Sequence, residues 1–470
     1  MISNRCEIIH NKSKQKENHN MTVQEYVERA RVAVNEIADY TQEQVDKLVY
    51  EGAKIIYKNA VPLAKLAVEE TGLGYFEDKI GKNTDTPTVF YDYLKDKKSV
   101  GIIEEIPELG IMKVAHPVGV VAAITPCTNP TVTPLGNFMH AVKGKNALVI
   151  SPHPRSLQTT TDTVNLIREA LVKCGAPADL IQVLAEPSMA ASAELMAACD
   201  LVVATGSSGL TKAAHESGTP ADGVGPGNPP AIVDRGYDLT EAAKMTVIAV
   251  GSDNGILCDG DNMLLYPEES ETAMIDALKA EGVVVFEDKE QIAQFRDALF
   301  HDGKLNPALI GKDAPVIAKA AGIDIPEDTK VVALKVDNVG KADVLNKEIM
   351  GPVVVLKGYD TFENAVDMAV NNMVESGGIG HTAGIFSNDE AHVRYAGERI
   401  PVARLLVNQP TPDAWGPATN SLSPAVSEGC GTWGNNILAD NVDYIHMLNV
   451  SKIVMPLDVE LPDPEKIFAD

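Results

Sequence analysis

The sequence has 470 residues, of which 45% are hydrophobic and 23% charged, and its formal net charge is -26 at pH 7. These values are ordinary for a soluble globular protein, and the length gives room for two or three domains with substantial cores. No apolar run approaches the roughly 20 residues that span a bilayer, so no membrane segment is predicted. The large negative charge argues against nucleic acid as a partner, because a nucleic acid is itself a polyanion.

The cysteines and the first residues indicate a cellular location. None of the six cysteines forms a C-x-x-C pair, which is typical of a protein in a reducing cytoplasm. Residues 1–20 are polar and lack the apolar core of a secretory signal. Because they are not amphipathic, as a docking peptide for an enzyme shell would be, we interpret them as a disordered extension. The expected location is the cytoplasm, with a bacterial microcompartment left open.

The N-terminal part combines helices with a hairpin. Capping-box spacing at Thr22–Glu25 and at Thr41–Gln44 predicts two helix starts. A third helix is expected at about 61–71, where a glycine ends it. Extended stretches at 100–105 and 111–116 flank a turn and predict a β-hairpin that reaches a neighbouring subunit.

Short apolar strands then alternate with helices, which predicts a parallel sheet wound by right-handed crossovers. The expected strands are 119–124, 147–150, 181–184 and 201–204, and the expected helices are 131–143, 157–174, 188–198 and 208–216. Ligands of such sheets bind beyond the carboxyl ends of the strands. Three polar loops are expected at that edge, at 125–130, 151–155 and 205–209.

A second alternating series begins after residue 234. Its strands are expected at 263–266, 283–286, 353–356, 383–386 and 404–407. The predicted fold class is therefore α/β, with two Rossmann-like parallel-sheet domains, an oligomerisation hairpin and a tail. We expect a cofactor-binding domain over 21–234 that includes the hairpin at 100–116, a catalytic domain over 235–428, and a return segment with an oligomerisation tail over 429–470.

Cys258 is the first candidate for chemistry. It lies in a small polar loop, Ser252 to Gly260, where a thiolate can be partly exposed. The alternative is a packed small hydrophobe, which is the commonest state of a free cysteine. Cys174 and Cys199 fit that alternative, because both lie near helix ends among apolar residues.

Other motifs allow both functional and structural interpretations. Asn129 or Thr128 can supply an oxyanion donor beyond a strand, or can simply form a turn before a proline. The stretch 206–209 precedes a helix N-terminus, which suits a phosphate. The stretch 223–227 resembles part of a dinucleotide fingerprint, but it leads into a strand and does not follow one, so we interpret it as a tight backbone crossing. His381 stands at a strand start, and no residue cluster has metal-ligand spacing, so no metal is predicted.

An ordered set of motifs covers nearly the whole chain. They are Ile-Thr-Pro-Cys-Thr-Asn-Pro at 124–130, Ser-Pro-His-Pro-Arg at 151–155, Gly-Val-Gly-Pro-Gly-Asn at 223–228, Asp-Asn-Gly-Ile-Leu-Cys at 253–258, Lys-Glu-Ile-Met-Gly-Pro at 347–352, Gly-His-Thr-Ala-Gly at 380–384 and Gly-Cys-Gly-Thr-Trp-Gly at 429–434. This set resembles the CoA-acylating branch of the aldehyde dehydrogenase superfamily. Within that branch, the sequence is similar to succinyl-CoA reductases, which are CoA-dependent succinate-semialdehyde dehydrogenases, and to the aldehyde half of bifunctional alcohol/acetaldehyde dehydrogenases.

The resemblance implies an oxidoreductase that interconverts a short-chain aldehyde and its acyl-CoA with NAD or NADP, and with coenzyme A as co-substrate. It implies that Cys258 forms a thioester, that Asn129 or Thr128 holds the oxyanion, and that His381 lies near the acyl and CoA path. The cofactor-binding residues that it implies are Thr125, Pro126, Ser151, His153, Pro154, Arg155, Gly206, Ser207, Val224, Gly225 and Glu348. Among these, Glu348 matches the acid that holds the nicotinamide ribose.

Differences from the hydrolytic relatives are informative. Those enzymes carry a Glu general base where Val224 stands, so no carboxylate activates water there and the thioester should last until CoA attacks it. Asp259 follows Cys258 where relatives have a small polar residue, and its charge should raise the pKa of the cysteine. Pro154 replaces the acid of many NAD-specific relatives and Arg155 can accept a 2′-phosphate, so NAD and NADP both stay open.

Two other functions remain as hypotheses. One is an enzyme of the glutamyl-phosphate reductase type, and the other is a non-catalytic cargo or scaffold with the same fold. The motifs at 253–258 and 429–434 argue against the first, and the acidic residue after Cys258 is the only support for the second. The hairpin predicts a homodimer or homotetramer. The sequence contains no iron alcohol dehydrogenase domain, so a separate alcohol dehydrogenase is an expected partner.

Overall fold

The computed structural model describes residues 21–469, and the predicted extension at 1–20 lies outside the described residues. The described part begins with α2 (Val23–Glu36), α3 (Gln42–Lys58), α4 (Ala60–Thr71) and α5 (Phe76–Leu94). Both predicted capping boxes are confirmed, because the side chains of Thr22 and Thr41 exchange hydrogen bonds with Glu25 and Gln44. Helix α5 was not expected from the sequence, since it contains Pro87. No helix within 21–469 is both long and apolar enough to cross a membrane.

A five-stranded parallel sheet forms the first α/β body, in the order β5-β4-β3-β6-β7. Its strands are β3 (Val120–Thr125), β4 (Ala147–Pro152), β5 (Ile181–Val183), β6 (Leu201–Thr205) and β7 (Ala221–Val224), and its helices are α6 (Val132–Lys143), α7 (Leu157–Lys173), α8 (Met189–Ala198) and α9 (Ser208–Glu216). Every residue of β3 and β4 is buried. Helices cover both faces of the sheet, and this explains why its central strands are continuously apolar.

One sequence interpretation of this sheet was wrong. Residues 221–224 form β7, so the glycine-rich stretch that starts at Gly223 does follow a strand. Alanine, aspartate and glycine rarely begin strands, which is why the pattern did not reveal it. No helix follows the stretch, however, and the chain crosses directly to β8 (Pro230–Val233). It is therefore a crossing between two sheets and not a dinucleotide fingerprint.

A seven-stranded parallel sheet forms the second α/β body, in the order β10-β13-β14-β9-β8-β15-β16. Its other strands are β9 (Met263–Pro267), β10 (Val284–Phe286), β13 (Val332–Lys335), β14 (Val353–Tyr359), β15 (Gly380–Phe386) and β16 (Val402–Val407), and its helices are α10 (Leu239–Gly251), α11 (Glu271–Ala280), α12 (Lys289–Leu299), α13 (Ala314–Ala320), α14 (Phe362–Ser376) and α15 (Glu390–Arg399). Two short strands of two residues each, β11 (Phe300–His301) and β12 (Lys304–Leu305), pair with each other outside this sheet. Because β8 pairs with β9 and β15, the chain enters this body before residue 230, a few residues ahead of the boundary expected at 234.

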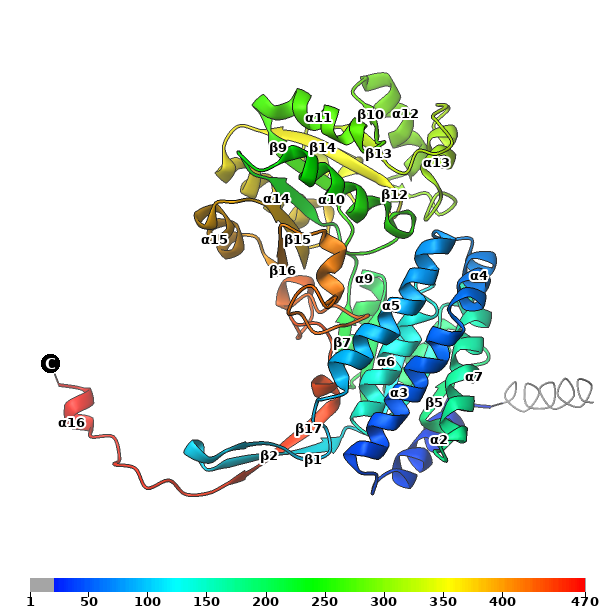
Figure 1. The fold of residues 1–470 in the computed structure, drawn as a ribbon, viewed down its shortest axis with the longest axis vertical. Coiled ribbons are helices and arrows are strands. Elements are labelled where there is room, and N and C mark those ends of the chain that lie inside the picture. Colours follow the sequence, from blue (N-terminus) through cyan, green and yellow to red (C-terminus); the bar gives the residue numbers. More distant parts are fainter. Residues whose placement is uncertain (1–20, 470) are drawn as a thin grey trace, which may run out of the picture.

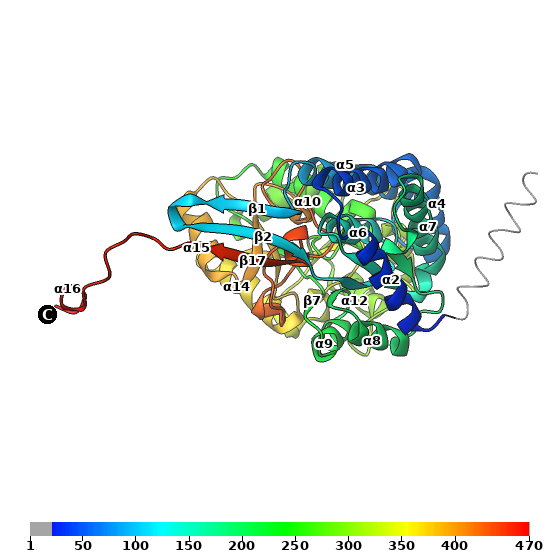
Figure 2. The same cartoon turned by 90° about the horizontal axis from the view of Figure 1, so that it is seen from below.

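The hairpin projects from the first body as an arm (Figure 1). It consists of β1 (Gly101–Ile106) and β2 (Ile111–Pro117), as predicted, and β17 (Leu448–Val454) adds a third antiparallel strand along β2. The three strands lie side by side in Figure 2. The residues after β17 run away from the body and include α16 (Pro464–Ile467). The start of the tail therefore pairs with its own chain, and its remainder is exposed.

Candidate active site

The carboxyl ends of the first sheet bring the predicted cofactor loops together. Ile124 is paired with Ser151, and Thr205 is paired with Val224, so the four loops that follow these strands leave the same edge. The backbone N–H of His153 donates to the carbonyl of Thr125 over 3.1 Å, and that of Gly206 donates to the carbonyl of Val224 over 3.1 Å. Adjacent predicted loops are therefore hydrogen-bonded to each other at the edge where ligands of parallel sheets bind.

Cys258 lies in the loop between α10 and β9, directly against the crossing segment. A Cβ added to Gly227 would lie 1.6 Å from the carbonyl oxygen of Cys258, so only glycine fits there. The loop itself turns sharply, because Asp253 and Asn254 have positive φ angles of 49° and 55°. These non-glycine residues in the left-handed region are a local source of backbone strain, which is often found at functional sites.

The surroundings of Cys258 are acidic. The residue is partly exposed, but burial of its thiol is the largest cause that raises its pKa, followed by the negative charges of Asp259, Glu428 and Glu348. The predicted effect of Asp259 on the pKa of this thiol is therefore confirmed in direction. Asp259 and Glu428 are buried and hydrogen-bonded to each other, and burial raises the pKa of both carboxyls. Arg404 lies 3.8 Å from Glu428 and compensates part of this charge.

Glu348 reaches the same place from the loop before β14. Burial raises the pKa of its carboxyl to about 8, and the backbone N–H of Gly227 donates a hydrogen bond to it. Gly227 thus contacts both Cys258 and Glu348. At neutral pH the Glu348 carboxyl is mostly protonated.

His381 lies deeper than Cys258. It is fully buried at the start of β15, its Nδ1 lies 3.0 Å from the Thr382 hydroxyl, and its Nε2 has no partner among residues 21–469. Burial, and then the charge of Arg404, lowers its pKa to about 3, so the ring is neutral. No hydrogen bond within the described chain joins it to Cys258. The preceding Gly380 packs against the carbonyl of Cys430, whose sulfur accepts a hydrogen bond from Gly225.

Sequence reasoning missed a charged cluster beside the oxyanion candidates. Asp253 accepts hydrogen bonds from the ammonium groups of Lys79 (2.9 Å) and Lys82 (2.5 Å), both of which come from α5. Lys79 also donates to the carbonyl of Thr128, and Lys82 donates to the side-chain oxygen of Asn129. The only signal in the sequence was the spacing of the two lysines, which a helix would place on one face, but α5 itself was not predicted.

The edge of the first sheet has features that fit a nicotinamide dinucleotide. The hydroxyl of Thr125 is buried and has no partner in the described structure, and a side chain added to Gly225 would point into open space. Ser207 caps α9, whose N-terminus faces this edge. Pro126 follows Thr125 in the same loop, and Ser151 is buried with its hydroxyl 2.8 Å from that of Ser192. His153, Pro154 and Arg155 are exposed, and the first accepts from the backbone N–H of the third.

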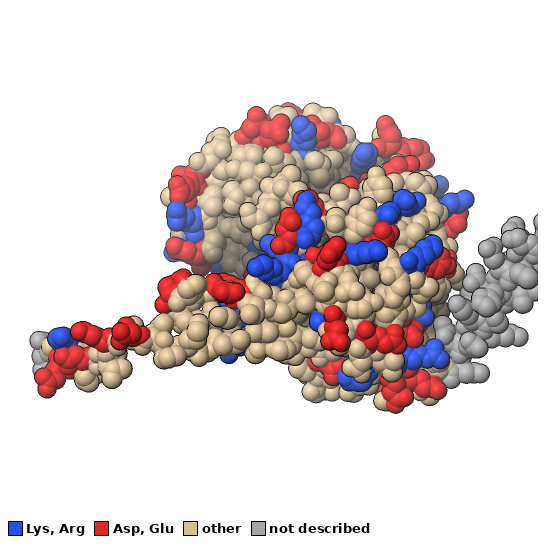
Figure 3. All heavy atoms as spheres, turned by 60° about the horizontal axis from the view of Figure 1, so that its bottom comes forward, with Lys and Arg blue, Asp and Glu red and all other residues tan. Residues whose placement is uncertain are grey.

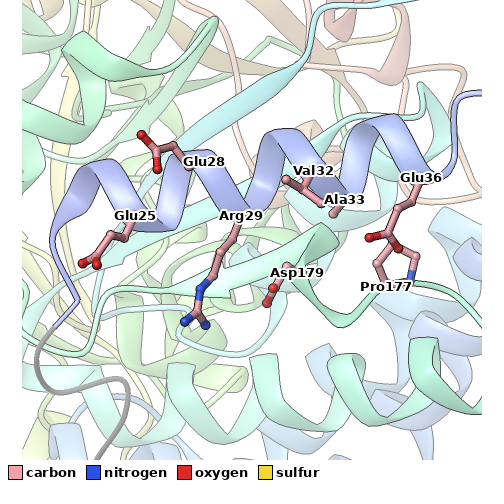
Figure 4. A pocket seen from close by; sticks show the side chains of 8 residues that line it. All are labelled: Glu25, Glu28, Arg29, Val32, Ala33, Glu36, Pro177 and Asp179. Carbon is pink, nitrogen blue, oxygen red and sulfur yellow. The ribbon is translucent and has the colours of Figure 1, made fainter.

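A hollow with a volume of about 290 Å³ lies away from this site, along α2, and carboxylates make up half of its lining residues (Figure 4). Its lining residues are Glu25, Glu28, Arg29, Val32, Ala33, Glu36, Pro177 and Asp179. It contains none of the predicted site residues. Among residues 21–469, no group of three or more His, Cys, Asp or Glu side chains is arranged to hold a metal ion.

Comparison with known proteins decides the family. The model of the aldehyde dehydrogenase family matches residues 10–285 and 332–418. The chain belongs to the aldehyde dehydrogenase family. This aldehyde dehydrogenase is 45% identical to the succinate-semialdehyde dehydrogenase (acetylating) of Clostridium kluyveri, over 95% of its own length and 99% of the relative. It is 39% identical to the sulfoacetaldehyde dehydrogenase (acylating) of Bilophila wadsworthia, over 93% and 95% of the two chains.

Solved structures agree with this. An acetylating aldehyde dehydrogenase from Geobacillus thermoglucosidasius superposes with a TM-score of 0.90 at 36% identity, over 94% of this chain and 97% of that one. A propionaldehyde dehydrogenase from Rhodopseudomonas palustris, solved with bound CoA and an acylated cysteine, superposes with a TM-score of 0.83 at 25% identity, over 92% and 97% of the two chains. The predicted fold class and the predicted acylating branch are confirmed. The enzyme is a CoA-acylating aldehyde dehydrogenase that interconverts an aldehyde and an acyl-CoA with NAD(P) and CoA.

Proposed function

We propose that Cys258 is the nucleophile and that it carries the acyl group as a thioester between the aldehyde and CoA. The observation that carries this proposal is the position of Cys258 against Gly227, where the crossing segment and Glu348 of the second body come together. Among the other described cysteines, Cys199 and Cys430 are buried and Cys174 lies at the end of α7. Cys127 is partly exposed, as Cys258 is, but it lies in the loop after β3 and not in the loop against Gly227.

The proposed reaction begins when the Cys258 thiolate attacks the aldehyde carbon, forming a C–S bond while the carbonyl electrons move to oxygen. Asn129 or Thr128, together with a backbone N–H, stabilises the resulting oxyanion. The nicotinamide cofactor, when bound, accepts the hydride from this carbon. As the C=O bond re-forms, Cys258 is left as a thioester. CoA thiolate then attacks the thioester carbon, the bond to Cys258 breaks, and acyl-CoA leaves. One proton is released to solvent, and the reverse sequence reduces acyl-CoA.

The chain favours CoA over water as the acyl acceptor. Val224 is apolar and buried at the position where hydrolytic relatives carry a base. The Glu348 carboxyl also lies beside Cys258, but burial raises its pKa to about 8. A carboxylic acid that holds its proton at neutral pH cannot take one from water, so Glu348 is a poor general base there. The thioester therefore persists until a thiol arrives.

The cofactor contacts follow from the loops at the sheet edge. We propose that Glu348 holds the nicotinamide ribose, that Ser151 to Arg155 surround the adenosine ribose, and that Gly206 and Ser207 lie at the pyrophosphate. Thr125, Pro126, Val224 and Gly225 complete the proposed contacts. The exposed Arg155 supports acceptance of a 2′-phosphate beside the ribose hydroxyls, so both NAD and NADP are expected to bind. His381 is proposed to lie beside the acyl and CoA path as a neutral ring.

The substrate and the assembly are also proposals. Two of the compared relatives are named for aldehydes with an anionic end, succinate semialdehyde and sulfoacetaldehyde, which supports a short anionic aldehyde. The arm exposes apolar side chains, including Ile102, Val450 and Ile453, and its visible face carries few charges (Figure 3). This supports a homodimer or homotetramer built through the arm. A separate alcohol dehydrogenase that uses the aldehyde, and a location in the cytoplasm or in a microcompartment, remain part of the proposal.

The test is the absorbance of reduced cofactor with a panel of aldehydes, both cofactors, and CoA present or absent. Continuous formation of reduced cofactor only in the presence of CoA is the expected result. Cys258→Ser should abolish turnover, whereas Cys174→Ser, a matched cysteine at a helix end, should leave it intact. Full turnover by Cys258→Ser, or equal turnover without CoA, would overturn the proposal.

A further inference from the structure

Asp253 ties α5 to the loop that carries Cys258. Its carboxylate is fully buried and accepts hydrogen bonds from Lys79, from Lys82 and from the backbone N–H of Tyr75 (2.8 Å). Burial alone would raise the pKa of Asp253, but the two ammonium groups outweigh it and hold the pKa below its usual value. The carboxylate is thus ionised and fixes the position of both lysines. It lies five residues before Cys258, in the strained part of the same loop.

Lys82 extends this connection to Asn129. Its Nζ donates to Asn129 Oδ1 over 2.8 Å. An ammonium group can only donate, so this contact decides which end of the amide faces the lysine. The NH₂ group of Asn129 must point the other way, and it has no acceptor among residues 21–469. Thr128, by contrast, meets the cluster only through its backbone carbonyl, which accepts from Lys79 over 2.9 Å.

The cluster acts electrostatically on the residue next to the proposed nucleophile. Burial and the charge of Glu428 raise the pKa of Asp259, and Lys82 is close enough to oppose them. Asp259 is the residue that follows Cys258. The Asn129 amide is therefore linked, through Lys82 and Asp253, to the loop that carries the thiol.

We propose that Lys82 is a positioning residue, which fixes the Asn129 amide so that its NH₂ group donates to the oxyanion formed at Cys258. This inference rests on the proposed role of Cys258 and selects Asn129 over Thr128 as the side-chain donor. A donor oriented before the reaction stabilises developing charge without reorganisation. A hydrogen bond from a cation to the amide oxygen also polarises the amide, which strengthens its N–H groups as donors.

The experiment measures kcat and KM for acyl-CoA formation by wild type and by the single variants Lys82→Met, Asn129→Ala and Thr128→Val. It also includes two double variants, in which Lys82→Met is combined with Asn129→Ala or with Thr128→Val. Succinic semialdehyde and butanal serve as an anionic and a neutral substrate. Loss of one oxyanion donor lowers kcat by about 100-fold to 1000-fold, so a misdirected donor should cost about 10-fold to 100-fold. We expect Lys82→Met to lower kcat by this amount for both aldehydes with little change in KM. Lys65→Met, which removes an exposed lysine from α4, is the matched control and should behave as wild type.

The double variants provide the decisive comparison. If Lys82 acts through Asn129, the combination with Asn129→Ala should be no slower than Asn129→Ala alone, and the effects of Thr128→Val and Lys82→Met should multiply. Lys82→Arg keeps a cationic donor and should recover most of the activity, so a folding defect of the methionine variant would not hide the effect.

Unchanged kcat in Lys82→Met, or independent effects of Lys82 and Asn129, would overturn the inference. A KM increase confined to succinic semialdehyde would also overturn it, because Lys82 would then bind the anionic end of the substrate. Loss of activity in Cys258→Ser with normal Lys82→Met would reject this inference alone, whereas activity in Cys258→Ser would reject the proposed function.

Discussion

Lys79 carries a buried ammonium group, and burial of this charge lowers the free energy of unfolding. Its side chain is 5% exposed, and its Nζ lies 2.9 Å from Asp253. Burial, and then repulsion from Lys82, lowers its pKa from 10.5 to about 8, although Asp253 opposes this. At about 1.4 kcal/mol for each pKa unit, protonated Lys79 should destabilise the fold by about 3 kcal/mol at neutral pH.

The sign of the pH dependence follows from which state holds the proton. The unfolded chain keeps it up to about pH 10.5, whereas the folded chain releases it near pH 8. Between these values the unfolded state binds more protons, so this group makes the free energy of unfolding rise with pH. The full cost is present below pH 8 and is gone above pH 10.5. Lys79→Met removes the charge and keeps an apolar side chain. It should therefore remove the contribution of Lys79 to the increase in the free energy of unfolding with pH.

Urea unfolding of wild type and Lys79→Met at intervals from pH 7 to pH 10.5 measures this effect. The titrating groups that do not interact with Lys79 are common to both proteins, so their contributions cancel in the difference between the two free energies. That difference should change by about 3 kcal/mol in favour of wild type as the pH rises. Lys65→Met, with a side chain that is 67% exposed, should show no such trend. A difference that stays constant, or that moves against wild type, would refute the reasoning about Lys79.

Two further predictions concern the reactive centre. The Glu348 carboxyl, with a pKa of about 8, is protonated at pH 7, so a cofactor that donates to its carboxylate should bind more tightly as the pH rises through 8. Fluorescence titration of NAD affinity from pH 6.5 to 9 measures this, and Glu348→Gln should flatten the profile; a flat wild-type profile would contradict it. Asp259→Asn should lower the pKa of Cys258, because it removes a negative charge that disfavours the thiolate. The pH profile of iodoacetamide alkylation reports that pKa, and an unchanged or higher value would count against the electrostatic account.

Much of the fold could be read from local patterns. The capping residues at Thr22 and Thr41 gave correct helix starts, because a cap depends only on residues three apart. The apolar runs of β3 and β4 were recognised because both faces of these strands are buried. Helix α5 and strand β7 were not recognised. Pro87 is atypical of a helix interior, and β7 contains few residues typical of strands although it pairs with β6.

The candidate site could be predicted only in part. Motif order indicated that Cys258 and Glu348 belong to one site, and the structure connects both through Gly227. The role of Lys82 was not visible, because it depends on where α5 lies relative to a loop 171 residues away in the sequence. The buried carboxyl of Glu428 was missed for the same reason, since only the fold brings it to Asp259.

The pairing of β17 with β2 has a consequence for biosynthesis. Leu448 is paired with Pro117, so β2 leaves the ribosome long before the strand that covers its edge. At roughly 5–20 residues per second, the delay is on the order of tens of seconds. During that time the hairpin presents an unpaired strand edge, which is a template for pairing with another chain. Neighbouring nascent chains on one messenger RNA are therefore expected to compete for this edge, and completion of the last strand ends that competition.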